Sequence, residues 1–552
     1  MYVRLFAFIA AVLLAIGGAF AYTLPPTTKA DPSPPAPHAS IPPQLFRTAD
    51  ACMSCHNGLV TPSGEDISFG SDWSATMMAN SARDPYWQAA VRREVTDHPT
   101  AQAEIEDECS VCHMPMARFE AHAQGREGQI FSHLPIGQSQ TRASRLAADG
   151  VSCTMCHQIQ GDNFGTRASF VGGFSVDTTS PMGQRSVFGP YSVDQGRTTI
   201  MHSSSGFRQV QSSHLQESEM CATCHTLYTD TRGPDGEVIG ELPEQVPYLE
   251  WRHSDYRDSQ SCQSCHMPVV QDSTAIASVF GQPRANVSRH TFRGGNFFML
   301  RMLNRYRGEL GVTALPRELN ESVARTTEHL KTSTARLSIE KPTLSNGDLH
   351  TTVTVDNLAG HKLPTAYPSR RVWIHFTVRD RTGDVIFDSG AFEPSGAIVG
   401  NDNDRNGDTY EPHYDRITDE EQVQVYESIM ATPDGEVTTG LLTAIRFIKD
   451  NRLLPDGFDK ATADEDIAVQ GKASEDDTFT GGGDRGEDVV NAADARSRLQ
   501  VHTELWYQPI AYRWAQNLAP YEARETDRFV RYYESMSDVS GTVLARATAT
   551  TR

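Results

Sequence analysis

The chain has 552 residues, of which 49 are Lys or Arg and 70 are Asp or Glu, so its formal net charge is −21. This length suffices for about two to four domains with a sizeable core. Strong acidity excludes nucleic acid as a partner and is compatible with a basic redox partner.

Residues 1–21 have the features of a bacterial secretory signal peptide. Arg4 supplies the positive charge, residues 5–20 are apolar, and Ala19-Phe20-Ala21 is a cleavage site of the small-x-small type. We expect cleavage before Tyr22 and a periplasmic or otherwise exported protein. The alternative is an uncleaved anchor, in which case the protein contacts the membrane or is held at the cell surface. Residues 22–43 are proline-rich and predict an extended linker.

Residues 44–295 contain all ten cysteines, arranged in five Cys-x-x-Cys-His motifs. This motif indicates covalent attachment of haem c, in which both thiols bond to the haem and the histidine ligates the iron from the proximal side. The predicted attachment residues are Cys52, Cys55, His56; Cys109, Cys112, His113; Cys153, Cys156, His157; Cys221, Cys224, His225; and Cys262, Cys265, His266. We number the motifs 1 to 5 in this order.

Zinc sites and disulfide frameworks also use paired cysteines. Zinc does not require a histidine directly after each second cysteine, and the long gaps between motifs do not match a zinc ribbon. A disulfide framework is typical of much smaller secreted domains. The sequence therefore predicts five haem c groups in a domain of helices and loops.

Residues 296–334 form a predicted helical connector. Apolar residues recur at helical spacing in 296–312, and 316–330 predicts a second helix. From residue 335 to 552 the pattern changes to alternation, which predicts a β-rich domain with an immunoglobulin-like sandwich. Its expected strands are 336–339, 352–355, 372–376, 385–387, 422–430, 437–447 and 499–507, with a loop at 456–494 and a helix at 520–536. The predicted fold class is α+β multidomain.

The segment Asp402-Asn403-Asp404-Arg405-Asn406-Gly407-Asp408 matches the first half of a calcium-binding loop. Oxygen ligands from Asp402, Asp404, Asn406 and Asp408 suit a hard cation. The second half does not match, because His413 stands where a bidentate Glu is expected. The alternative is a solvated acidic turn.

Residues 45–380 resemble the multihaem cytochromes c, the group that includes the tetrahaem cytochromes of ammonia oxidisers, hydroxylamine oxidoreductase and pentahaem nitrite reductase. The resemblance rests on the haem motifs and on short stretches around them. These stretches are Cys112-His113-Met114-Pro115, Cys265-His266-Met267-Pro268, Leu249-Glu250-Trp251, Ser288-Arg289-His290-Thr291-Phe292, Gly294-Gly295-Asn296 and Gly360-His361-Lys362-Leu363-Pro364-Thr365. Pentahaem nitrite reductase has a Cys-x-x-Cys-Lys motif, which is absent here, and hydroxylamine oxidoreductase carries eight haems, so neither activity is carried over.

Function depends on the second axial ligand of each iron, because a saturated iron only passes electrons whereas an open one binds small molecules. The resemblance favours His290, and then His214 and His253, which precede haem motifs. The other candidate distal ligands are His122, His133, His202 and His361. His361 either caps a haem or is a polar loop residue. For His98 we prefer a surface or hydrogen-bonded interpretation.

The first motif differs, since no histidine lies between His56 and His98. The intervening residues 73–94 are predicted to be helical in part and carry Met77 and Met78. A thioether ligand there would raise the reduction potential of the first haem. The alternative is that both methionines pack against a porphyrin face.

These features predict an exported pentahaem cytochrome that transfers electrons between redox partner proteins by haem-to-haem hopping, and that is not an enzyme. The alternative is a haem-dependent oxidoreductase that reduces a small nitrogen or sulfur oxyanion at one five-coordinate haem. A third interpretation is a structural, filament-forming cytochrome.

Overall fold

The structure is a computed structural model that describes residues 44–493 and 498–551. The predicted signal peptide and linker lie outside the described residues. Residues 1–42 and 43–552 form two separate units, and everything below concerns the second unit. Within the described part, no helix combines the length and the apolar character needed to cross a membrane.

The haem region, residues 44–295, consists of short helices, three small two-stranded sheets and long connections. Its helices are α1 (Asp50–Met53), α2 (Phe69–Ser74), α3 (Pro85–Asp97), α4 (Gln102–His113), α5 (Pro115–His122), α6 (Arg142–Ala148), α7 (Cys153–Cys156), α8 (Gln195–Ser205), α9 (Ser218–His225), α10 (Pro247–Arg252) and α11 (Cys262–His266). Its strands are β1 (Ser186–Gly189), β2 (Arg208–Gln211), β3 (Leu227–Arg232), β4 (Val238–Gln245), β5 (Thr274–Ala275) and β6 (Pro283–Arg284).

The start of α3 shows why the helix predicted in residues 73–94 is divided. The Asp84 side chain accepts hydrogen bonds from the backbone N–H groups of Tyr86 and Trp87, and Pro85 occupies the first helical position. Both features begin a new helix. The segment therefore forms α2 and α3 with a break between them.

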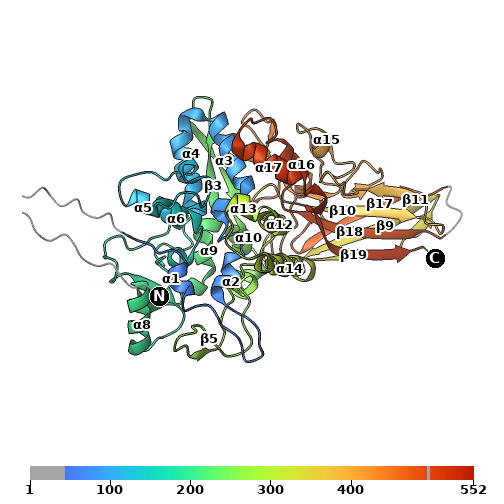
Figure 1. Cartoon of the computed structure of the whole chain (residues 1–552). Helices are drawn as coiled ribbons and strands as arrows, with labels where there is room; N and C mark the ends of the chain where they lie inside the picture. The colour runs from blue at the N-terminus through green and yellow to red at the C-terminus, as the bar shows by residue number, and fades with distance from the viewer. Residues whose placement is uncertain (1–43, 494–497, 552) are drawn as a thin grey trace, which may run out of the picture. The chain divides into compact units, whose positions relative to one another are not determined.

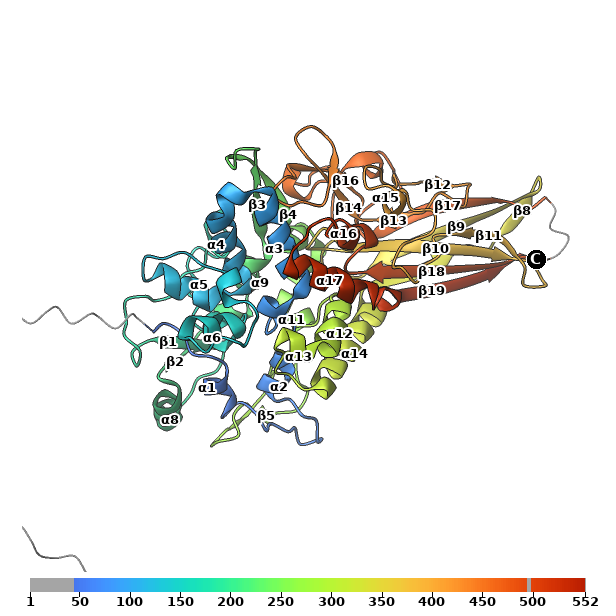
Figure 2. The same cartoon turned by 45° about the horizontal axis from the view of Figure 1, so that its top comes forward.

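The connector contains three helices, α12 (Phe297–Arg305), α13 (Arg307–Leu310) and α14 (Pro316–Ser333). Both predicted helices are confirmed, and the first is divided in two. It ends at Gly311, whose φ of +65° lies in the left-handed region. In both views α12 and α14 lie between the haem region and the large sheets (Figures 1 and 2).

The C-terminal region is built around two five-stranded sheets and one three-stranded sheet. The first has the order β11 (Val385–Ser389), β10 (Arg371–Arg379), β18 (Gln500–Gln508), β19 (Thr542–Thr550), with β13 (Val425–Tyr426) paired to β10. The second has the order β12 (Arg416–Ile417), β17 (Gly483–Asn491), β9 (Asp348–Asn357), β7 (Ala335–Ile339), with β8 (Thr343–Ser345) on β9. The third consists of β15 (Val437–Thr438), β14 (Ser428–Ala431) and β16 (Arg446–Asp450).

Both five-stranded sheets contribute to one hydrophobic core, with Val353 and Val355 from β9 and Phe376 and Val378 from β10 among its buried members. The same core includes Phe297 and Leu300 of the connector. The predicted β-rich region is thus confirmed, whereas an immunoglobulin-like strand order remains a prediction.

The sequence patterns missed the two long strands β17 and β19, the short strands β8 and β12, and the strands of the haem region. Residues 456–494 were expected to be a loop, but they contain the nine-residue strand β17, which pairs along its length with β9. The last strand, β19, was not expected at all. The predicted strands 422–430 and 437–447 are each interrupted, giving β13 to β16.

Three helices follow or interrupt these strands: α15 (Asp402–Arg405), α16 (Tyr512–Gln516) and α17 (Arg524–Glu534). α17 lies within the helix predicted at 520–536. It packs against α3 of the haem region (Figure 1), where Arg92 pairs with Glu525 at 2.8 Å.

Asp488 of β17 makes the stability of the fold pH-dependent. It is buried, its Oδ1 lacks a hydrogen-bond partner, and burial followed by the charge of Glu487 raises its pKa to about 8. An unfolded Asp has a pKa of about 3.9, so between about pH 4 and 8 the folded chain holds one more proton than the unfolded chain. Stability therefore falls as the pH rises through this window.

We expect Asp488→Asn to remove most of this slope, which is at most about 1.4 kcal/mol per pH unit. The test is the urea midpoint at pH 5 and pH 8. The exposed Asp434 gives a control, Asp434→Asn, which keeps the wild-type slope. Equal slopes in all three proteins would contradict the prediction.

Candidate haem centres

The five motifs sit on short helical turns that present both thiols and the histidine on one side. Motifs 2, 4 and 5 end α4, α9 and α11, and motif 3 begins with α7. In motifs 1 and 3 the histidine N–H donates to the carbonyl of the first cysteine at 3.0 Å. None of the ten cysteines forms a disulfide in the described part of the chain, and all are partly buried. Each motif therefore has the local geometry that thioether attachment requires.

Four of the five motif histidines have Nδ1 against a backbone carbonyl oxygen. A carbonyl can only accept, so Nδ1 carries the proton and the Nε2 lone pair is left for a metal. The pairs are His56 with Ile276 at 2.6 Å, His113 with Ser81 at 3.0 Å, His157 with Phe188 at 2.7 Å, and His266 with Arg293. Burial lowers the pKa of all four rings, which keeps them neutral. These residues fit the proximal-ligand role predicted for them.

The motifs lie close to one another although they are spread over more than 200 residues. Thiols from different motifs lie close enough to shift each other's pKa in three pairs, namely Cys52 with Cys153, Cys112 with Cys224, and Cys221 with Cys262. The charge of Cys224 also raises the pKa of Cys156. Motif 1 therefore neighbours motif 3, and motif 4 neighbours motifs 2, 3 and 5.

Two candidate distal histidines face motif histidines at the separation that a shared iron requires. Two metal–imidazole bonds of about 2.0 Å in line place the ring centres roughly 6 Å apart. The centres of His157 and His290 are 6.3 Å apart, and those of His266 and His361 are also 6.3 Å apart. The ring planes differ by only 18° and 16°. The structure thus brings two of the candidate distal histidines to motif histidines.

The environment of His361 leaves its Nε2 available, whereas Nδ1 of His290 has no hydrogen-bond partner in the described part of the chain. His361 Nδ1 lies 2.9 Å from the carbonyl oxygen of Lys362, so its Nε2 is unprotonated when the ring is neutral. Burial lowers the pKa of His361, and it lowers the pKa of His290 to about 3. His361 reaches back from the loop between β9 and β10, which agrees with the haem-capping interpretation.

His329 was missed by the sequence analysis. It lies on α14, and its ring centre is also 6.3 Å from that of His266, with an angle of 63° between the planes. His329 belongs to the connector, outside the haem region and the first C-terminal loop in which distal ligands were expected. Its position four residues after Arg325, on one helix face, was the available signal.

The remaining predicted histidines have other partners. Nε2 faces an oxygen in four of them: His122 with Asp107, His202 with the Gly183 carbonyl, His214 with the Ile159 carbonyl, and His253 with the Asp459 carbonyl. His133 Nδ1 contacts Ser144 Oγ at 3.1 Å. The geometry favours hydrogen-bonding roles for these five, and ligation by them remains a prediction.

Two other expectations concern residues near motifs 1 and 2. His98 is buried and its Nε2 has no hydrogen-bond partner in the described part of the chain, so the surface or hydrogen-bonded interpretation is wrong.

Met77 and Met78 are both half-buried, and Met77 packs against the main core. Packing therefore explains Met77, and ligation by either methionine remains a prediction.

The loop that carries His361 is held by a buried ionic network. Glu250 of α10 has no exposed surface, and its Oε2 accepts from Thr365 Oγ1 at 2.5 Å and from the Lys362 N–H at 3.1 Å. Arg452 pairs with Glu250 at 2.9 Å and with Asp450 at 2.7 Å. Lys362 Nζ pairs with Asp450 at 2.7 Å. A carboxylate of the haem region thus positions the loop of the C-terminal region.

The predicted calcium segment is organised differently. Asp404 lies on α15 and pairs with the buried Arg371 at 2.8 Å, while its second oxygen accepts from the Ile398 N–H. Asp402 and Asp408 are held by local contacts, in which their N–H groups donate to Glu411 and Asn406. Among the described residues, the only group of three or more metal-type ligands lies elsewhere. These contacts favour a structural turn.

That other group is His413, Asp476 and Asp484, and its hydrogen bonds argue against a metal. The amide nitrogens of Gln424 and Asn451 lie 3.0 and 3.1 Å from His413 Nδ1. The amide oxygens accept from backbone N–H groups, which fixes their orientation. Nδ1 is therefore an acceptor, and Nε2–H donates to Asp476 at 3.0 Å.

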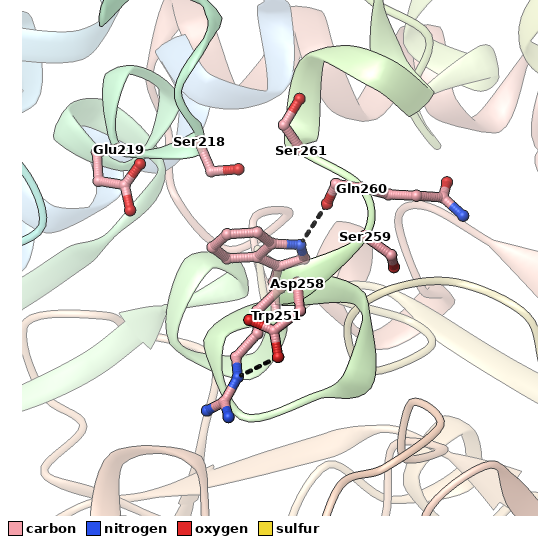
Figure 3. Close-up of a pocket in the computed structure, with 8 residues that line it drawn as sticks. Ser218, Glu219, Trp251, Asp258, Ser259, Gln260 and Ser261 are labelled. Carbon is pink, nitrogen blue, oxygen red and sulfur yellow. Dashed lines mark hydrogen bonds and ion pairs between the residues drawn. The ribbon is translucent and has the colours of Figure 1, made fainter.

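A pocket of about 320 Å³ opens beside motifs 4 and 5 (Figure 3). Ser218 and Glu219, which precede Cys221, line one side, and Ser261, which precedes Cys262, lines another. The Trp251 indole N–H donates to the Gln260 carbonyl at 2.9 Å and orients the ring along this space. The pocket belongs to the attachment site because its walls lead into both cysteine pairs.

We expect Glu250→Gln to destabilise the protein by about 3 kcal/mol, because removal of one partner leaves buried charge uncompensated. The urea midpoint measures this. Glu321→Gln is the control, since Glu321 is 55% exposed and its ion pairs are worth at most about 1 kcal/mol. An effect of Glu250→Gln no larger than that of the control would show that the network does not hold the loop.

Comparison with known proteins shows a likeness of fold. No protein-family model matches the chain, and no curated protein matches it. The structure is similar to the crystal structure of a penta-heme cytochrome c552 from Thermochromatium tepidum, with a TM-score of 0.53 and 14% sequence identity over 92% of this chain and 100% of that chain. The chain thus has the fold of a multihaem cytochrome c.

Proposed function

We propose that this protein is an exported pentahaem cytochrome c that transfers electrons between redox partners. The observation that carries the proposal is the grouping of five Cys-x-x-Cys-His motifs, four with histidines oriented by a backbone carbonyl. The fold likeness to a penta-heme cytochrome supports it. Five haem c groups would supply the redox chemistry when bound. The partners are a donor and an acceptor protein, and the chain's acidity suits a basic one.

The proposed axial ligands are His157 with His290 and His266 with His361, which supports electron transfer at those two centres. The polypeptide keeps these rings neutral by burial, and a backbone carbonyl at Nδ1 orients His157, His266 and His361. The order of the motifs in space supports a route from motif 1 through motif 3 to motif 4, with motifs 2 and 5 beside motif 4.

A second candidate is reduction of a small nitrogen or sulfur oxyanion at an open iron. His225 of motif 4, like His56 and His113, has no second histidine ring stacked across from it in the described part of the chain. Burial, followed by the nearby charges of His266 and Arg370, lowers the pKa of His225 to about 4. Motif 4 is favoured among the three because Arg370 forms no ion pair with a carboxylate within the described ranges. A guanidinium there would attract an anion.

The test is the electron paramagnetic resonance spectrum of the oxidised holoprotein, with spins counted against total haem. For a pure carrier we expect five haems per chain, all low-spin. His290→Ala should convert about one haem in five to high spin, because it removes an axial ligand. His361→Ala should do the same when combined with His329→Ala, since His329 lies at the same distance from His266.

His350→Ala is the matched control, because His350 of β9 pairs with Glu487 of β17 and stacks on no motif histidine in the described part of the chain. It should leave the spectrum unchanged. Fewer than five haems per chain in the wild type would refute the pentahaem proposal. A high-spin haem in the wild type that shifts on addition of nitrite, hydroxylamine or sulfite would move the function to the reductase.

A further inference from the structure

Three arginines gather around one buried carboxylate at the edge of motif 5. Asp72 of α2 is 5% exposed, and it binds Arg289 through both oxygens at 2.8 Å. Arg325 of α14 lies 3.7 Å from the same carboxylate. Arg293 follows four residues after Arg289, and within the described ranges it has no carboxylate within ion-pair distance. We call Arg289, Arg293 and Arg325 the arginine cluster.

Three carboxylates contact the cluster, but none of them pairs with Arg293 within the described ranges, and two of the three are more than half exposed. The other carboxylates that touch it, Glu65 on Arg289 and Glu321 on Arg325, have side chains that are 54% and 55% exposed. The Nε atoms of Arg293 and Arg325 are buried, and neither has a hydrogen-bond partner in the described part of the chain. Buried donors of this kind are rarely left unsatisfied, so they indicate a missing acceptor.

The cluster is attached directly to the fifth motif. The carbonyl of Arg293 accepts from His266 Nδ1, and the N–H of Arg293 donates to the His266 carbonyl at 3.0 Å. Arg325 stands one helical turn before His329, whose ring centre is 6.3 Å from that of His266. Two segments far apart in sequence thus place guanidinium groups beside one motif histidine.

We propose that the arginine cluster binds anionic oxygens and that its ligand is the pair of propionate carboxylates on the haem of motif 5. Guanidinium groups form paired, charge-assisted hydrogen bonds with carboxylates, which would satisfy both orphaned Nε donors. The inference rests on the proposed function, because it requires a haem at motif 5. A free inorganic oxyanion offers the same chemistry and is the other source.

The arginine cluster should affect the midpoint potential of the haem at motif 5. Positive charge near a haem favours the reduced state, and it keeps the propionates ionised. Loss of one guanidinium should lower the midpoint potential of one haem. It should also raise the propionate pKa toward neutrality. The midpoint potential of this haem should then depend on pH between about pH 6 and 8, whereas the wild-type potential should change little over that range.

The test uses the holoprotein with Arg293→Gln and Arg325→Gln, followed by redox titration in a spectroelectrochemical cell at several pH values. Arg317→Gln is the matched control, because Arg317 lies on the same helix with a side chain that is 78% exposed. The lysine variants Arg293→Lys and Arg325→Lys retain the charge and should restore part of the potential. Haem content is measured in every preparation.

A lower, pH-dependent potential in both glutamine variants, with Arg317→Gln like the wild type, supports the propionate assignment. Calorimetric titration with nitrite and inorganic phosphate distinguishes the other source. If the wild type binds either anion and the glutamine variants lose affinity by about ten-fold or more, the ligand is a free oxyanion and the propionate assignment is overturned.

If all variants hold five haems and match the wild type in both measurements, the cluster binds no anion and the proposal is wrong. If the wild type itself carries fewer than five haems, the proposed function fails, and this inference fails with it. The haem count therefore separates the two failures.

Discussion

Glu250 is the residue that ties the His361 loop of the C-terminal region to the haem region. It is fully buried on α10 of the haem region, yet its partners come from the loop after β9 and from Arg452 after β16. A carboxylate without exposed surface is tolerated only when charge and hydrogen bonds compensate it. Because Thr365 and Lys362 supply that compensation, the His361 loop is held in one place.

The placement of His361 then follows from the same contact. A histidine in a surface loop has many conformations, and ordering it would weaken any bond to a metal. Here the loop is ordered by the ionic network and by its chain neighbours, and the His361 ring lies nearly parallel to that of His266. The C-terminal region is therefore part of the proposed haem site, because it supplies one of its side chains.

Charge is distributed unevenly around the motifs. The chain as a whole is strongly acidic, but within its described part Arg370 near motif 4 and Arg293 beside motif 5 have no carboxylate at ion-pair distance. Arginines grouped in an otherwise acidic chain indicate a site for a bound anion. The acidic surface around them would disfavour the approach of free anions from solution. This contrast favours, as the ligand of the arginine cluster, the propionates of a haem that is covalently attached to the chain.

Local chemistry let the sequence predict the attachment residues, since a motif of five consecutive residues carries all the groups that bond to one haem. Alternation and helical spacing likewise predicted β7, β9, β10, β11, β18, α14 and α17. β17 was missed because its residues are mostly polar or glycine, and only pairing with β9 makes them a strand.

The distal positions were decided by tertiary structure. His290, His329 and His361 come from three different segments, and nothing in their local sequence sets their distance from a motif histidine. Tertiary structure also decided the partner of Asp404. The sequence around Asp404 resembles a calcium-binding loop, but its side chain pairs with the buried Arg371. The local sequence around a residue determines which chemical groups the residue can bind, whereas the fold determines which of those groups lies within bonding distance.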